Sequence, residues 1–199
     1  MSQAELLSWK NSNQEELNSI KNWINDFLCN PHPLLGRTGN VCPFTREAID
    51  KDSIYFSLEN SFYLNQEDEI QKITSQIKLF KELKTNNNES YKVIINAYPY
   101  IDKNEYNKIE LIQNELKPLF VQESLMIGQF YPGCKEKGLW NDKFFPLDSP
   151  ISLLAIRNMA ITDIAFLISD NYFVEKYLQV FEKKGEDFLM KFMERKKSL

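Results

Sequence analysis

Short apolar runs alternate with segments of helical periodicity between residues 53 and 184, and this alternation constrains the fold most. The runs that predict strands are residues 53–58, 91–97, 125–130 and 151–156. Apolar residues spaced three and four apart predict helices over residues 66–83, 104–117 and 171–184. Strands that alternate with helices favour a layered α/β fold, with α+β as the alternative. We therefore expect one domain with a small mixed sheet of about four strands and helices packed on it.

Helices are also expected at both ends of the chain. Ser12 and Glu15 have the spacing of a capping box, so a first helix is predicted over 13–27. Pro118 is expected to end or kink the helix over 104–117. The last helix is expected to pause near Gly185 and then resume. We expect one domain over 1–199, with a core at 14–182 and a C-terminal helical extension at 185–199.

Composition narrows the class of protein. The 199 residues are 43% hydrophobic and 26% charged, as in ordinary globular proteins, and the net charge is −4. This balance argues against a partner recognised through its phosphates, so no nucleic acid is expected. No apolar run approaches the roughly 18 residues of a membrane span, and the N-terminus lacks an apolar signal core. Three cysteines without regular spacing predict reduced thiols and a cytoplasmic protein.

Two irregular segments, 30–44 and 129–141, stand out from the regular elements. These segments and the strand that leads into the second contain five of the six glycines, and the first segment also holds the only histidine. Proline fixes the backbone and glycine permits positive φ, so the segments are expected to be shaped loops. We expect them to meet at one end of the sheet and form a site. The alternative is that they are simply the two longest loops.

His32 and Cys42 are the first candidates for chemistry. His32 lies between two prolines and is a candidate metal or haem-iron ligand or a general base. The alternative is a loop histidine that hydrogen-bonds the backbone. Cys42 precedes a short helix expected over 44–49, where a thiol is a candidate nucleophile or soft metal ligand. The alternative is a small buried apolar residue.

Two further interpretations combine these residues. Cys29, His32, Cys42 and Cys134 have the chemistry of a four-ligand zinc site, although no pair of cysteines has the usual C-x-x-C spacing. Cys42 as nucleophile with His32 as base would instead make a thiol enzyme.

Arginines are rare, with four among the 24 basic residues. Arg37, Arg46 and Arg157 lie in or beside the irregular segments and the last predicted strand, where their planar forks could hold a carboxylate or phosphate. For Arg157 the alternative is a salt bridge with Asp163 or Asp148.

Several motifs together resemble the bacterial DUF6875 family of unknown function over residues 14–182. The longest motif is His-Pro-x-Leu-Gly-Arg-x-Gly-x-Val-Cys-Pro-Phe at 32–44, and shorter ones lie at 128–134, 138–141 and 149–159. The resemblance implies no established activity.

The chain is also faintly similar to YqcI/YcgG-like proteins, some of which are haem-dependent enzymes acting on N-hydroxylated guanidino amino acids. This similarity covers Val41–Phe44 followed by Ile54–Leu58, and Leu153–Arg157. It implies haem as cofactor, with His32, Cys42 or Tyr131 as iron ligand. Arg46 is a further candidate cofactor-binding residue because of its planar charged fork. The sequence departs from the family pattern at Tyr131 and Asn158, where histidine is common, and this departure weakens the haem interpretation.

The resulting expectation is a small cytoplasmic enzyme of bacterial specialised metabolism. Haem-dependent oxidation of an amino-acid-like substrate would use His32 or Cys42 at the iron, with Arg37 and Arg157 holding a carboxylate. The alternatives are a non-catalytic small-molecule-binding or interaction module and the thiol enzyme. Expected partners are a small-molecule substrate and, at most, a second copy of the chain in a homodimer.

Overall fold

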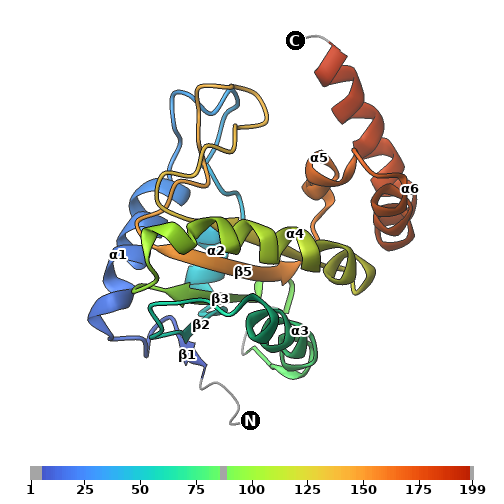
Figure 1. Cartoon of the computed structure of the whole chain (residues 1–199). Coiled ribbons are helices and arrows are strands. Elements are labelled where there is room, and N and C mark those ends of the chain that lie inside the picture. The colour runs from blue at the N-terminus through green and yellow to red at the C-terminus, as the bar shows by residue number, and fades with distance from the viewer. Residues whose placement is uncertain (1–5, 86–88, 198–199) are drawn as a thin grey trace.

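The computed structural model, which describes residues 6–85 and 89–197, is built on one five-stranded mixed sheet (Figure 1). The strands lie in the order β1-β2-β3-β5-β4, so β5 is inserted between β3 and β4. β2 and β3 run parallel, and the other neighbouring pairs are antiparallel. Their bounds are Leu7–Ser8 (β1), Ile54–Leu58 (β2), Val93–Tyr98 (β3), Leu125–Phe130 (β4) and Ser152–Asn158 (β5). The four expected strands are confirmed, and the short edge strand β1 is an addition.

The expected helices are present, and a short helix at Ile164–Leu167 is an addition. The α-helices are Glu15–Trp23 (α1), Thr45–Asp50 (α2), Gln66–Glu82 (α3), Tyr106–Gln122 (α4), Ile164–Leu167 (α5) and Asn171–Lys197 (α6). Short 3₁₀ turns lie at Glu89–Tyr91, Lys103–Glu105 and Ile161–Asp163. The N- and C-terminal helices are therefore confirmed, except that residues 198–199 of the expected extension lie outside the described residues.

The helices cover both faces of the sheet. Side chains alternate along β3, so Ile94 and Tyr98 join the core beneath α3 and α4, while Ile95 and Ala97 join the core beneath α1 (Figure 1). A third apolar cluster packs α5 and α6 against the end of α4 and against β4. These layers make the chain a single mixed helix-and-sheet domain, as the element order predicts.

The predicted capping box at the first helix is wrong. The Ser12 hydroxyl donates to the Trp9 carbonyl over 2.9 Å, and the helix begins after Gln14 without a side-chain cap. The helix begins two residues beyond the position that Ser12 could cap, so its hydroxyl bonds within the preceding turn instead.

Pro118 does not end α4, which continues to Gln122. Proline removes one backbone hydrogen bond, but Leu116, Phe120 and Val121 are buried around it. Their burial outweighs the cost of roughly 3 kcal/mol that proline carries inside a helix.

The break in the last helix falls at Glu182 (φ 47°, ψ −132°), three residues before the predicted pause at Gly185. Gly185 is itself buried, and a Cβ there would lie 2.9 Å from Cβ of Phe181. Its small size therefore serves close packing within the helix.

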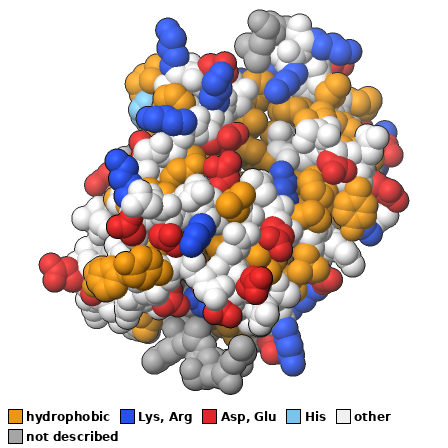
Figure 2. All heavy atoms as spheres, viewed as in Figure 1, with side chains coloured by type: hydrophobic (Ala, Val, Ile, Leu, Met, Phe, Trp, Pro, Cys, Tyr) orange, Lys and Arg blue, Asp and Glu red, His pale blue; other side chains and the backbone are white. Residues whose placement is uncertain are grey.

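None of the helices in the described ranges combines the length and hydropathy needed to cross a membrane. Charges of both signs are interspersed on the face shown in Figure 2, with hydrophobic side chains between them.

Candidate functional site

The two irregular segments meet, as predicted. Asn141 donates from Nδ2 to the Leu34 carbonyl over 2.9 Å. Gly36 packs against Trp140 so closely that a Cβ at Gly36 would lie 2.6 Å from the Trp140 Cβ. The loops lie side by side in Figure 1, beyond the carboxyl end of β4. Sequence segments about 100 residues apart thus form one structural unit.

A π-helical turn, η1 (Ile24–Leu28), continues α1 into this unit. Asn30 closes the turn by donating from Nδ2 to the carbonyls of Asn25 and Asp26, over 2.8 and 3.1 Å. The rings of Trp23 and Phe27 stack, with centroids 5.9 Å apart. Wide turns of this kind are frequent at functional sites.

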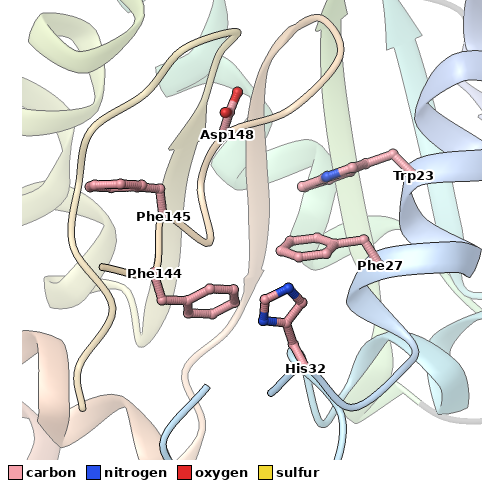
Figure 3. A pocket seen from close by; sticks show the side chains of 6 residues that line it. All are labelled: Trp23, Phe27, His32, Phe144, Phe145 and Asp148. Atoms are coloured by element: carbon pink, nitrogen blue, oxygen red, sulfur yellow. The ribbon is translucent and has the colours of Figure 1, made fainter. Parts of the chain in front are cut away.

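An open pocket of about 330 Å³ lies between this turn and the second loop (Figure 3). Its lining residues are Trp23, Phe27, His32, Phe144, Phe145 and Asp148. The imidazole of His32 stacks on Phe144 with centroids 4.7 Å apart, and Phe27 meets its edge at 5.8 Å. Five aromatic rings and one carboxylate therefore surround the pocket.

Hydrogen bonding defines the state of His32. Its Nδ1 accepts from the Leu34 backbone N–H over 3.2 Å, so the neutral ring carries its proton on Nε2. In that state Nε2 is a donor, whereas a general base or an iron ligand needs a free lone pair on the nitrogen that acts. The side chain is half-buried, and Figure 2 shows this histidine at the surface beside hydrophobic side chains.

Asp148 supplies the only carboxylate among the lining residues. Its Oδ1 accepts from the Gly133 backbone N–H over 2.8 Å, and the residue is exposed. Lys135 lies over the Phe145 ring, 5.1 Å from its centroid.

The guanidinium groups of Arg37 and Arg157 are engaged within the protein. Arg37 donates from Nη1 to the Thr38 carbonyl over 3.0 Å and from Nη2 to the Val41 carbonyl over 2.9 Å. Arg157 forms a bidentate pair with Asp163, in which both N–O distances are 2.6 Å. Of the two partners considered for Arg157, the structure shows Asp163. Neither fork lines the aromatic pocket.

Burial and charge act in opposite directions at Arg157. Burial alone lowers its pKa, but the hydrogen bonds and charge of Asp163 outweigh this effect, so the pKa is raised. The Asp163 side chain is 1% exposed and that of Arg157 is 26% exposed. For Arg37, burial lowers the pKa, the charge of Cys42 opposes this effect, and the nearby Arg195 adds to it.

Cys42, Arg46 and Tyr131 do not line the pocket. Cys42 is half-buried, and Arg46 is exposed on α2. Tyr131 donates to Glu110 on α4 over 2.8 Å, and burial followed by this hydrogen bond raises its pKa. Of the three expected iron ligands only His32 lines the pocket, and its Nδ1 already accepts a hydrogen bond from Leu34, so the three residues do not come together around one haem site there.

The zinc interpretation is not supported either. Within residues 6–85 and 89–197, no group of three or more His, Cys, Asp or Glu side chains is placed to hold a metal ion. Cys29, His32, Cys42 and Cys134 therefore do not assemble into a four-ligand site.

The sequence patterns did not indicate most of the pocket-lining residues, nor the contact that the end of α6 makes with the two loops. Phe144 and Phe145 follow the second irregular segment, and their adjacent rings are the one local signal of an aromatic wall. Arg195, near the end of α6, lies 4.1 Å over the Trp140 ring and donates to the Gly36 carbonyl over 3.1 Å. The end of α6 thereby contacts both loops.

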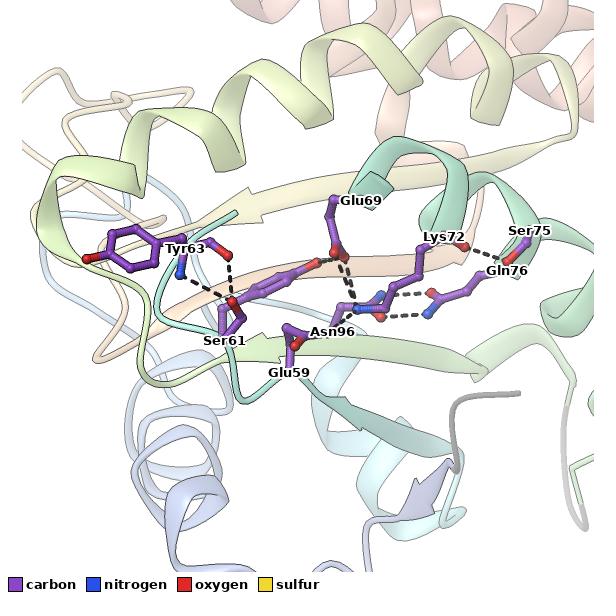
Figure 4. A network of polar contacts seen from close by, with 9 residues as sticks. Glu59, Ser61, Tyr63, Glu69, Lys72, Ser75, Gln76 and Asn96 are labelled. Carbon is purple, nitrogen blue, oxygen red and sulfur yellow. Dashed lines mark hydrogen bonds and ion pairs between the residues drawn. The ribbon is translucent and has the colours of Figure 1, made fainter. Parts of the chain in front are cut away.

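A cluster of polar side chains that the sequence patterns did not indicate lies under α3 (Figure 4). The Tyr98 hydroxyl donates to Glu69 over 2.5 Å, and Lys72 lies 3.1 Å from both Glu69 and Glu59. The amides of Gln76 and Asn96 bond reciprocally, over 2.6 and 2.8 Å. Burial raises the pKa of Tyr98, and the charge of Glu69 adds to this effect. The drawn groups satisfy one another, so this cluster fixes α3 to the sheet. The aromatic pocket remains the better candidate site.

Comparison with known proteins gives one family. No curated protein and no solved structure matches the chain. The model of a domain of unknown function, DUF6875, matches residues 17–191, which include both loops and every pocket-lining residue. The chain therefore belongs to the DUF6875 family, as its loop motifs predict.

Proposed function

We propose that this protein binds a planar, positively charged small molecule in the aromatic pocket. The observation that carries the proposal is the lining, in which five rings surround the space and Asp148 is the only charged side chain. Aromatic faces carry partial negative charge and attract cations, and they also stack on planar ligands. A carboxylate at the rim adds charge complementarity.

Binding is better supported than catalysis because the pocket offers few reactive groups. Cys42 and both engaged arginines lie outside the lining, and Nδ1 of His32 already accepts from the Leu34 backbone N–H. A donor at Nε2 can orient a ligand acceptor, while the net charge of −4 favours the approach of cations. The non-catalytic binding module is thus the alternative that we adopt.

Three probes with the same ring size test the proposal: 1-methylnicotinamide (a cation), nicotinamide (neutral) and nicotinate (an anion). Isothermal titration should give the tightest binding for the cation and the weakest for the anion. Asp148→Asn should weaken the binding of the cation alone, by about two- to fivefold in affinity. This is the range for an exposed ion pair that contributes up to about 1 kcal/mol. Phe145→Ala should lower the affinity for both the cation and the neutral probe by about fivefold, since a ring contact contributes about 1 kcal/mol.

Matched controls lie nearby. Asp142 is an exposed carboxylate in the same loop that pairs with Lys137, and Phe62 is an exposed ring that does not line the pocket. Asp142→Asn and Phe62→Ala should leave all affinities unchanged. Equal binding of the three probes, or equal losses in Asp142→Asn and Asp148→Asn, would contradict the proposal.

The haem-dependent oxidation implied by the YqcI/YcgG-like similarity is a separate hypothesis that the site supports less well. Titration with hemin separates the two: a Soret shift that His32→Ala abolishes would favour the haem enzyme. In either case we place the function in the cytoplasm, where free Cys29, Cys42 and Cys134 persist as thiols.

A further inference from the structure

Cys29 and Cys42 lie at the base of the first loop, where its two ends run side by side. Pro31 and Asn40 form an antiparallel bridge. Val41 donates from its backbone N–H to the Asn30 carbonyl, and Cys42 donates to the Leu28 carbonyl, both over 2.9 Å. Cys42 is thus a member of the second pair, and Cys29 directly follows its partner Leu28, so the two cysteines lie on the facing ends of the loop. The Leu28 carbonyl belongs to the peptide bond that leads into Cys29, so this hydrogen bond holds the two Cα atoms within roughly 7 Å, about the upper limit for a disulfide.

Positive charge gathers around the two thiols. Arg37 reaches the carbonyl of Val41, the residue before Cys42, and Arg157 lies over the ring of Phe44, two residues after it. The Cys42 charge acts on the pKa of both guanidinium groups, and the Arg46 charge acts on that of Cys29.

The thiols differ in access. Cys42 is half-buried, whereas Cys29 is 3% exposed, and burial raises the pKa of Cys29 although Arg46 opposes this effect. An oxidant therefore reaches Cys42 first, while Cys29 is positioned to react from within. Cys134, which is 1% exposed in the second loop, provides a third thiol for comparison.

We propose that Cys29 and Cys42 form a redox-active dithiol that hydroperoxides convert to a disulfide closing the base of the first loop. The Cys42 thiolate attacks the outer peroxide oxygen, which forms a sulfenic acid and releases the other oxygen as an alcohol, or as water from hydrogen peroxide. The Cys29 sulfur then attacks the Cys42 sulfur, the S–S bond forms, and the sulfenic oxygen leaves as water. The two thiols are oxidised by two electrons, and the peroxide is reduced.

The disulfide would join residues on either side of His32 and directly follow the π-helical turn that carries Phe27. It would therefore hold the first wall of the aromatic pocket in place. The dithiol does not depend on the ligand proposed for that pocket, so either proposal can fail alone.

The test uses the full native chain and hydrogen peroxide. After treatment, alkylation under denaturing conditions should count one free thiol in place of three, and the intact mass should fall by two hydrogens. Trypsin cleaves at Arg37 and Arg46, so the expected product is peptide 22–37 joined to peptide 38–46. Dithiothreitol should restore three thiols.

Two variants complete the test. Cys134→Ser should form the same linked peptides, and Cys29→Ser should instead leave a sulfenic acid on Cys42 that dimedone captures. The wild-type measurement stands even if a variant does not fold. The proposal is overturned if Cys29 and Cys42 both remain alkylatable after treatment, or if the linkage involves Cys134 or a second chain.

Discussion

Replacing Gly36 with alanine tests whether the contact between the two loops is as tight as the structure shows. Three glycines in these loops have positive φ: Gly36 at +73°, Gly39 at +86° and Gly133 at +77°. An alanine at any of them incurs roughly 1–2 kcal/mol of left-handed strain. They differ in the space around the added Cβ, which makes Gly39 and Gly133 matched controls.

The added methyl group meets a different environment at each position. At Gly36 it would lie 2.6 Å from the Trp140 Cβ and 3.2 Å from the Trp140 carbonyl oxygen. At Gly39 the nearest atom is 3.7 Å away on the Arg37 side chain, and at Gly133 nothing lies within 4 Å. Carbon atoms pack at about 3.5–4.0 Å, so only Gly36→Ala forces the loops apart. Overpacking of this kind costs about 1–3 kcal/mol beyond the shared strain.

Urea unfolding of the three variants measures this difference. Gly36→Ala should be less stable than both controls by about 1–3 kcal/mol, which corresponds to a further drop in Tm of about 2–12 °C at this chain length. Gly36→Ala should also weaken the binding of 1-methylnicotinamide, because Phe144 and Phe145 move with the second loop. Equal destabilisation in all three variants would refute the loop contact.

Three further outcomes are expected. Asp163→Asn should lower the free energy of unfolding by about 3–5 kcal/mol in urea, because it leaves the Arg157 charge without its buried partner, and the surface variant Asp142→Asn should cost less than about 1 kcal/mol. Pro118→Ala should raise that free energy by up to about 3 kcal/mol, because a backbone donor returns to an exposed helical position; an unchanged urea midpoint would argue against the continuous α4. Burial raises the pKa of Tyr177 from 10.0 to about 12, so its contribution to stability is full below pH 10 and is lost as the pH rises to 12. The Tyr177→Phe variant should not lose stability over this pH range. If the free energy of unfolding falls equally in the two proteins above pH 10, the prediction is wrong.

Local patterns in the sequence predict much of the fold. The apolar spacing of Ile73 and Phe80 predicts α3, and the apolar run from Val93 to Ala97 predicts β3, because these signals repeat within one element. The predictions that failed concern ends and interruptions, as at Ser12 and Pro118. There, the outcome depends on which nearby group takes a hydrogen bond and on how much apolar surface is buried on either side.

The candidate site could be predicted only in part. Clustered glycines and prolines indicate the two loops, and His32 does line the pocket between them. The sequence gives no sign that Trp23 and Phe27 turn toward that pocket, because the π-helical turn has no periodicity of its own. Roles expected for Arg37 and Arg157 likewise depended on partners that composition does not reveal.

The sequence by itself determined the succession along the chain of the four longer strands and the main helices, the apolar faces that build the two main cores, and the two loops that carry the site. These follow from residue spacing and from the backbone preferences of glycine and proline, which act over a few residues. Only the tertiary structure decided that β5 lies between β3 and β4, that Arg157 pairs with Asp163 rather than Asp148, and that Trp140 receives both Gly36 and Arg195. Each of these depends on which surfaces meet when the whole core packs, and a one-dimensional pattern does not contain that information.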